Sequence, residues 1–255
     1  MERKLAESRI VEICRALRLP AVGRDAARSA DEAIRQGLDP LVYLVQLLEM
    51  ELEQRRERRT ARHLKEANFP VVKTLESFDF TRNSALPEAQ IRRLHDCDYV
   101  ANAEPVLFIG EPGTGKTHLA CSLGAAAARQ GHRVKFVTAA RLVTQLVEAQ
   151  DSHELNRIVS RYSRVDVLII DELGYVPLSP SDAELLFRVL GERNELRTVV
   201  VTTNLPFSEW TTMLPNPRLC RAIVDRLTHR AHIIETGGDS IRLQEALRRR
   251  DDPKS

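Results

Sequence analysis

Residues 110–117 have the types and the spacing of a phosphate-binding loop. They read Gly-Glu-Pro-Gly-Thr-Gly-Lys-Thr, which is the pattern GxxxxGK followed by Ser or Thr. Glycines let the backbone curl so that its N–H groups point at phosphate oxygens, and the lysine can reach the β- and γ-phosphates. The hydroxyl of Thr117 is placed to ligate Mg²⁺. The loop therefore predicts that the chain binds a nucleoside triphosphate together with Mg²⁺.

The surroundings of this loop support the same prediction. Such a loop needs a strand before it and a helix after it. Here the apolar run 106–109 precedes the loop, an Ala-rich stretch over 118–130 follows it, and Gly131 is suited to end that helix. The residues expected to hold the nucleotide are Gly110, Glu111, Pro112, Gly113, Thr114, Gly115, Lys116, Thr117 and His118.

Two acidic residues follow a second apolar run, 167–170. Asp171 is expected to hold Mg²⁺ together with Thr117, through the water shell of the ion. Glu172 is expected to orient or deprotonate the water that attacks the γ-phosphate. The competing interpretation is an exposed acidic pair at the end of a strand, and the phosphate loop upstream weighs against it.

Further candidates for catalysis lie closer to the C-terminus. Asn204 follows the apolar strand 199–203 and is expected to help to place the attacking water, although a turn-forming Asn is the alternative. Arg226 is favoured over Arg221 as an arginine that reaches the γ-phosphate bound to a neighbouring subunit. Surface ion pairing is the alternative for both arginines. Lys116, Glu172, Asn204 and Arg226 are therefore the expected catalytic residues.

From Lys73 onward, apolar strands alternate with helices, up to about residue 235. This alternation predicts a parallel sheet that is covered by helices on both faces. The expected strands are 106–109, 133–138, 165–170, 198–203 and 232–235. The expected helices are 86–100, 118–130, 139–150, 154–162, 182–195, 207–214 and 219–229.

The first 70 or so residues are expected to be entirely helical. Pro20 is expected to end the first helix, and Ser29-Ala-Asp-Glu32 reads as a capping box that starts a short helix closed by Gly37. Asp39-Pro40 then begins a long helix that reaches about Ala67. We therefore expect a small helical domain over 1–70 and an ATPase domain over 71–255.

The long helix changes character halfway along. Its first half carries an apolar stripe that we expect to pack on the two preceding helices, formed by Leu41, Leu44, Leu48 and Leu52. Its second half has six cations and one acid within residues 55–65, which predicts contact with the phosphates of duplex DNA. A solvated, salt-bridged helix end is the alternative. The expected DNA contacts are Arg55, Arg58, Arg59, Arg62 and Lys65.

Composition limits the class of protein. The chain has 255 residues, 43% of them hydrophobic and 29% charged, with a net charge of only +2. Any affinity for nucleic acid must therefore come from local patches. The charged N-terminus has no apolar signal region, and no apolar stretch approaches the ~18 residues that a membrane span requires. Four dispersed cysteines without a CxxC pattern suit reduced thiols, and we expect a cytoplasmic protein.

In this order, the motifs resemble the IstB/DnaC-like branch of the AAA+ ATPases. The phrases that carry the resemblance are GEPGTGKTHLA, VLIIDELGYVPLS, VVVTTN, IVDRL and GDSIRL. Residues 65–70 and 73–80 resemble the linker that precedes the ATPase core in that branch. The phrases DELGYVPLS and GDSIRL, together with the N-terminal portion, are most similar to IstB, the ATPase helper of insertion-sequence transposases.

The resemblance implies a fold and a function. The fold is an α/β P-loop AAA+ core with a parallel five-stranded sheet in the order 5-1-4-3-2, preceded by a small all-helical domain. The function is ATP hydrolysis with Mg²⁺, ATP-promoted assembly of a homo-oligomer on duplex DNA, and regulation of a partner transposase. Two departures from loader-type relatives are the missing Gly-Glu-Arg before the late helix and the short stretch after the fifth strand.

Three other functions remain open at this stage. A replicative helicase loader shares the core but engages a helicase through its N-terminal region. A nucleotide-gated DNA scaffold would need no hydrolysis, and Glu172 argues against it. A small-molecule kinase is disfavoured because Asn204 and the acidic pair suit attack by water.

Overall fold

The computed structural model describes residues 2–83, 86–175 and 177–237. Two compact units, 1–62 and 63–255, divide the chain. The GDSIRL phrase (238–243) lies outside the described residues, as does Val176 of the acidic phrase. Each unit is considered by itself below.

Helices make up the described part of the first unit. They are α1 (Arg3–Ala16), α2 (Pro20–Gln36) and the part of α3 (Pro40–Ala67) that ends at Arg62. The start of α3 is as expected, because Asp39 Oδ1 accepts the N–H of Leu41 at 2.8 Å and Pro40 follows Asp39. The expected helix start at Ser29 is wrong, because α2 already begins at Pro20 and runs through Ser29 to the left-handed Gly37. Proline is well tolerated in the first turn of a helix. Pro20 therefore follows the end of α1 and is also the first residue of α2.

The packing face expected for α3 is also wrong. The leucines of the expected stripe are all 44% exposed or more: Leu41, Leu44, Leu48 and Leu52. The buried residues of α3 in the first unit are instead Leu47 and Glu51, and Leu47 packs with Cys14, Val22 and Ala26. Apolar residues occur all round the first half of α3, so their periodicity did not single out one face.

Glu51 explains which face of α3 is buried. Its Oε2 accepts the N–H groups of Ala21 and Val22 at 2.7 and 3.2 Å, and these two groups lie in the first turn of α2. Its Oε1 accepts from Arg55 Nε at 2.9 Å. Such N–H groups have no partner within their own helix, and a carboxylate at a helix N-terminus satisfies them. Burial raises the pKa of Glu51, but hydrogen bonds from Arg55, Val22 and Ala21 outweigh it and hold the pKa below its usual value.

We predict that Glu51→Ala destabilises the first unit by about 1–3 kcal/mol, since it removes a cap and leaves buried donors without a partner. Faster amide hydrogen exchange of α1 and α2 in the intact chain would report the loss. Glu53→Ala is the control, because Glu53 is exposed and pairs only with Arg56 among the described contacts. The stabilisation is present near neutral pH and is lost as the pH falls through the lowered pKa of Glu51. Equal exchange in the two variants would contradict this role.

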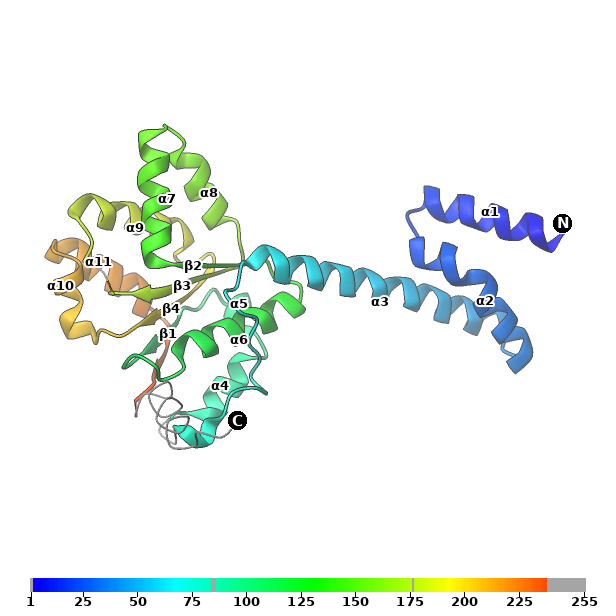
Figure 1. Cartoon of the computed structure of the whole chain (residues 1–255), viewed down its shortest axis with the longest axis horizontal. Coiled ribbons are helices and arrows are strands. Elements are labelled where there is room, and N and C mark those ends of the chain that lie inside the picture. The colour runs from blue at the N-terminus through cyan, green and yellow to red at the C-terminus, as the bar shows by residue number, and fades with distance from the viewer. Residues whose placement is uncertain (1, 84–85, 176, 238–255) are drawn as a thin grey trace, which may run out of the picture. The chain divides into compact units, whose positions relative to one another are not determined.

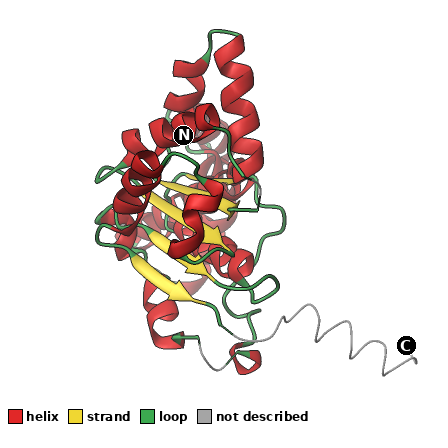
Figure 2. Cartoon of the chain, turned by 90° about the vertical axis from the view of Figure 1, so that its left-hand side faces the viewer, coloured by secondary structure: helices red, strands yellow, loops and turns green. Residues whose placement is uncertain are grey.

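The second unit is built on a five-stranded parallel sheet (Figure 2). Its order, β2-β3-β4-β1-β5, confirms the order implied by the family resemblance. Apolar residues fill β1 and the first four positions of β3, and these residues are buried. The strands are β1 (Val106–Ile109), β2 (Val134–Thr138), β3 (Val167–Leu173), β4 (Thr198–Thr203) and β5 (His232–Glu235).

Helices cover both faces of this sheet (Figure 1). Alternate strand residues belong to different cores: Leu107 and Leu168 pack with one set of helices, whereas Phe108 and Ile169 pack with the other. The first set is α7 (Ala139–Asp151), α8 (Leu155–Ser163), α9 (Pro180–Arg193), α10 (Trp210–Met213) and α11 (Pro217–Thr228). The second set is α4 (Glu88–Leu94), α5 (Asp98–Ala101) and α6 (Lys116–Arg129).

Two expected helices are interrupted. The helix expected over 86–100 breaks into α4 and α5 at Cys97, whose φ is +63°. The helix expected over 207–214 is a 3₁₀ turn, η2 (Phe207–Glu209), followed by the single turn α10. A further 3₁₀ turn, η1 (Phe80–Arg82), lies before α4. Within the described ranges, no helix is long and apolar enough to cross a membrane.

Candidate nucleotide-binding site

The phosphate loop joins the end of β1 to the start of α6. Gly113 and Gly115 have φ values of +87° and +95°, in the region where a side chain would be strained. A Cβ on Gly110 would lie only 2.6 Å from Thr236 Oγ1, so this position also requires glycine. The loop therefore has the backbone that its glycine spacing predicted.

Lys116 and Thr114 fold onto the loop itself. Lys116 Nζ donates to the carbonyl oxygens of Gly110 and Glu111 at 2.5 and 2.8 Å. Thr114 Oγ1 donates to the carbonyl of Glu111 at 2.9 Å and lies 2.6 Å from Thr236 Oγ1. The ammonium group is thus held at the loop, where phosphate oxygens can replace the carbonyls as its acceptors. Thr236 was missed in the sequence because nothing in its spacing relates it to the loop.

The acidic pair meets the loop at the end of β3. Thr117 Oγ1 lies 3.0 and 3.2 Å from the two carboxylate oxygens of Asp171, which is buried. Thr202 Oγ1 donates to Asp171 Oδ1 at 2.6 Å. Glu172 is exposed, and its backbone N–H donates to the same Thr202 hydroxyl at 2.9 Å. The structure therefore brings together the two residues expected to hold the metal ion.

A cavity of about 420 Å³ opens beside these groups. Loop residues and Glu172 line one part of it, and the segment 70–82 lines another. This segment contributes Lys73, Phe78, Asp79 and Arg82. We did not single out these residues from the sequence, although residues 65–70 and 73–80 carried the resemblance to a linker. The size of the cavity suits a nucleotide whose phosphates lie on the loop.

His118 ties the loop helix to that segment. Its Nε2 lies 3.0 Å from the carbonyl oxygen of Thr74 and 3.3 Å from Ser77 Oγ, and its ring meets the Phe78 ring edge-on. Burial is the main cause that lowers the pKa of His118, which favours the neutral imidazole. The side chain therefore holds one wall of the cavity and adds little charge to it.

Asn204 lies directly after β4, at the same edge of the sheet as the acids. Its Oδ1 is buried and has no hydrogen-bond partner within the described part of the chain. Asn204 is not among the residues that line the cavity. The orphaned acceptor is therefore near the site but not directed into the nucleotide cavity.

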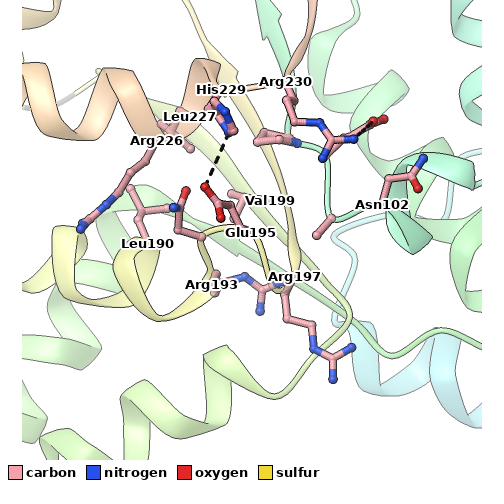
Figure 3. Close-up of a pocket in the computed structure, with 14 residues that line it drawn as sticks. Asn102, Leu190, Arg193, Glu195, Arg197, Val199, Arg226, Leu227, His229 and Arg230 are labelled. Atoms are coloured by element: carbon pink, nitrogen blue, oxygen red, sulfur yellow. Dashed lines mark hydrogen bonds and ion pairs between the residues drawn. The ribbon is translucent and has the colours of Figure 1, made fainter.

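Arg226 lies outside the nucleotide cavity of its own chain. Its guanidinium carbon stands 3.8 Å from the centre of the Phe187 ring, and Nη1 is buried without a partner among the described residues. Arg226 lines a second cavity of about 260 Å³, in which its side chain runs past Leu190 and away from the His229–Glu195 pair (Figure 3). Arg221 is exposed on the same helix. Neither arginine can complete the site of this chain in the geometry described.

The five expected DNA contacts are all exposed on α3. Arg55, Arg58, Arg59 and Arg62 belong to the first unit and Lys65 to the second. Arg55 is engaged internally, because it donates to Glu51 at 2.9 Å and to the carbonyl of Arg18. Arg58 donates to Gln54 Oε1 at 3.0 Å. Arg55 thus supports the helical unit, in addition to any external contact.

The residues present suit ATP and Mg²⁺. Mg²⁺ prefers hard oxygen ligands, which Thr117 and the buried Asp171 carboxylate supply side by side. Lys116 and the helix N-terminus at Gly115 supply positive charge and N–H donors for the phosphates. When bound, the ion would neutralise charge on the β- and γ-phosphates.

Comparisons with known sequences match the chain to one family model and to several curated relatives. Residues 13–249 match the family model described as IstB-like ATP binding protein. A relative from Geobacillus stearothermophilus, named for insertion sequence IS5376 and for ATP binding, is 36% identical over 94% of this chain and 95% of its own length. A relative from Pseudomonas aeruginosa, named in the same way for IS21, is 38% identical over 84% of this chain and 81% of its own length.

Solved structures share the fold at low identity. AMPPCP-bound DnaA from Aquifex aeolicus matches with a TM-score of 0.58 and 20% identity, over 71% of this chain and 56% of that chain. The match therefore spans little more than half of that DnaA chain. A structure of DnaI matches with a TM-score of 0.51 and 21% identity, over 66% of this chain and 89% of its own. These likenesses show a shared fold, and the sequence matches are more specific: the chain belongs to the family of IstB-like ATP-binding proteins.

Proposed function

We propose that this protein hydrolyses ATP as a homo-oligomer assembled on duplex DNA, and that it thereby regulates a partner transposase. The observation that carries the proposal is the meeting of Thr117 with Asp171 beside a cavity that Glu172 also lines. The relatives' names, which refer to insertion sequences and ATP binding, support the link to transposition.

Each group of the site has a part in this chemistry. Lys116 and the loop N–H groups bind the phosphates, and Thr117 with Asp171 holds the metal ion. Glu172 is exposed on the cavity, where its carboxylate can orient a water and accept its proton. Asn204 does not line the cavity here, so it would have to turn toward the cavity to help to place that water; its buried Oδ1, unpaired among the described residues, is free to do so.

We predict that two substitutions in this site affect different steps: one weakens ATP binding, and the other slows hydrolysis. Lys116→Ala should weaken ATP binding by about tenfold or more, because it removes a charged hydrogen-bond donor to the phosphates. Glu172→Gln should leave ATP binding nearly unchanged and lower kcat by about 100-fold or more. Titration with a fluorescent ATP analogue and a phosphate-release assay measure the two effects. If Glu172→Gln released phosphate at the wild-type rate, ATP would act here without the proposed hydrolytic base.

The position of Arg226 favours catalysis across subunits. Arg226 does not line the nucleotide cavity of its own chain and lines a different cavity instead. A guanidinium supplied by a neighbour would stabilise the charge that develops on the γ-phosphate. Hydrolysis would then require oligomers and rise more than linearly with protein concentration.

Mixing two inactive variants tests this arrangement. Lys116→Ala keeps Arg226 and cannot bind ATP well, whereas Arg226→Ala keeps an intact phosphate loop. We expect Arg226→Ala alone to lose about 1,000-fold or more in kcat, and the mixture to recover part of the wild-type activity. Arg221→Ala is the matched control on the same helix and should stay close to wild type. The absence of recovery, or a larger loss in Arg221→Ala, would count against Arg226.

We assign DNA binding to the basic end of α3, in the helical domain expected over 1–70. Arg58, Arg59, Arg62 and Lys65 are exposed there. A second basic group lies on the core, where Lys135, Arg141 and Arg161 line one cavity. Burial, followed by the charges of Arg161 and Arg141, lowers the pKa of Lys135. Clustered cations that outnumber the acids around them favour contact with phosphates.

Replacing Arg58, Arg59 and Arg62 with Gln should weaken duplex binding for all sequences. Each lost phosphate contact should also reduce the slope of log K against log salt by about 0.9. Arg55 is kept because it supports the fold through Glu51. Fluorescence anisotropy at several salt concentrations measures the slope, with Arg28→Gln/Arg35→Gln on α2 as the control. An unchanged slope would make this end of α3 a solvated surface.

A further inference from the structure

The two acids of the site lie in an irregularity of the sheet. Ile170 of β3 pairs with Val201 of β4, but the next pair is Leu173 with Thr203. Asp171 and Glu172 therefore face a single residue of the neighbouring strand, Thr202. Two residues opposite one is the arrangement of a β-bulge, and bulges next to active sites redirect side chains.

The bulge determines what the second acid can do. In a regular strand, successive side chains point to opposite faces of the sheet. Glu172 departs from strand geometry with a φ of +60°, which non-glycine residues rarely adopt. Its side chain is exposed on the cavity that Lys116 and Thr117 also line, whereas Asp171 is buried against Thr117. The unusual backbone thus lets two consecutive acids serve one site.

The Thr202 hydroxyl holds both parts of this arrangement. It donates its single proton to Asp171 Oδ1 at 2.6 Å and accepts the N–H of Glu172 at 2.9 Å. Thr202 is 1% exposed, so water cannot readily replace it. Because the bulge removes the regular ladder partner of Glu172, the hydroxyl also satisfies a backbone donor that would otherwise be unpaired.

We propose that Thr202 is a positioning residue for ATP hydrolysis. Its hydroxyl fixes the Asp171 carboxylate toward Thr117, and it fixes the backbone of Glu172 so that the catalytic carboxylate stays on the nucleotide cavity. The proposal rests on the hydrolytic function proposed above. Thr202 also lines the nucleotide cavity, but its hydroxyl is engaged by the two acids, so the proposed role runs through them.

Two substitutions of Thr202 distinguish the effect of its hydroxyl from the effect of its branched shape. Thr202→Val keeps the branched shape and removes the hydroxyl, whereas Thr202→Ser keeps the hydroxyl. Thr198→Val is the matched control, because Thr198 is also buried in β4 and donates its hydroxyl to the carbonyl of Tyr99 at 3.0 Å. Thr198→Val loses one buried hydrogen bond at the other end of the same strand.

The expected kinetic result is a fall in kcat with little change in ATP affinity. Residues that orient the groups around a metal ion typically contribute about 10–100-fold, so Thr202→Val should lose that much in kcat and require more Mg²⁺ for half-maximal activity. Thr202→Ser should remain within about threefold of wild type, since the hydroxyl is retained. Loss of activity in Thr198→Val equal to that in Thr202→Val, or a failure of Thr202→Ser to restore it, would overturn the proposal.

A second measurement does not depend on hydrolysis. Hydrogen exchange of the peptide 167–175 should be faster in Thr202→Val than in wild type, because the Glu172 amide loses its acceptor, and unchanged in Thr198→Val. If wild type released no phosphate on DNA at any protein concentration, the proposed function would fail. The exchange result would then decide by itself whether Thr202 holds Glu172. Equal exchange in wild type and Thr202→Val would refute the role of Thr202 even in an active enzyme.

Discussion

The site depends on one constraint of the sheet: β4 lies between the strand that leads into the phosphate loop and the strand that ends in the two acids. Phe108 of β1 pairs with Thr202 of β4, and Thr202 faces the bulge in β3. Because the strands are parallel, their carboxyl ends lie at one edge of the sheet, where ligands bind in such folds. The hydrogen bond from Thr117 to Asp171 spans this edge and joins two segments that are distant in sequence.

Much of this arrangement could be predicted from the sequence, for a physical reason. Strands buried on both faces are rich in apolar and β-branched residues, so 106–109 and 198–203 matched the structure residue for residue. The phosphate loop is a local motif, because the residues that bind phosphate are adjacent in the sequence. Thr202 carries no such signal, since threonine is an ordinary strand residue and its role depends on a bulge that pairs it with Asp171 and Glu172.

The first unit shows where hydrophobic periodicity is insufficient. Leu44 and Leu48 have helical spacing, yet the face that carries Leu47 and Glu51 is buried instead. The hydrogen bonds of Glu51 account for the buried face of α3. The N–H groups in the first turn of α2 need an acceptor, and the Glu51 carboxylate supplies it. Burying a carboxylate is costly unless it is hydrogen-bonded, and here Arg55 and two backbone donors meet that condition. Leu44 and Leu48 are left exposed because the face that carries Glu51 is the buried one.

Arg226 shows the converse case, a charged group whose Nη1 has no hydrogen-bond partner among the described residues. An aromatic face can stabilise a guanidinium, and Phe187 does so at 3.8 Å. The ring cannot accept the hydrogen bonds of the group, however, and Nη1 stays buried and unpaired among the described residues. A buried donor of this kind favours any state in which an anionic acceptor reaches it. Such an acceptor cannot come from the chain's own nucleotide, because Arg226 does not line that cavity. This geometry supports the proposal that Arg226 is one half of a site that a second subunit completes.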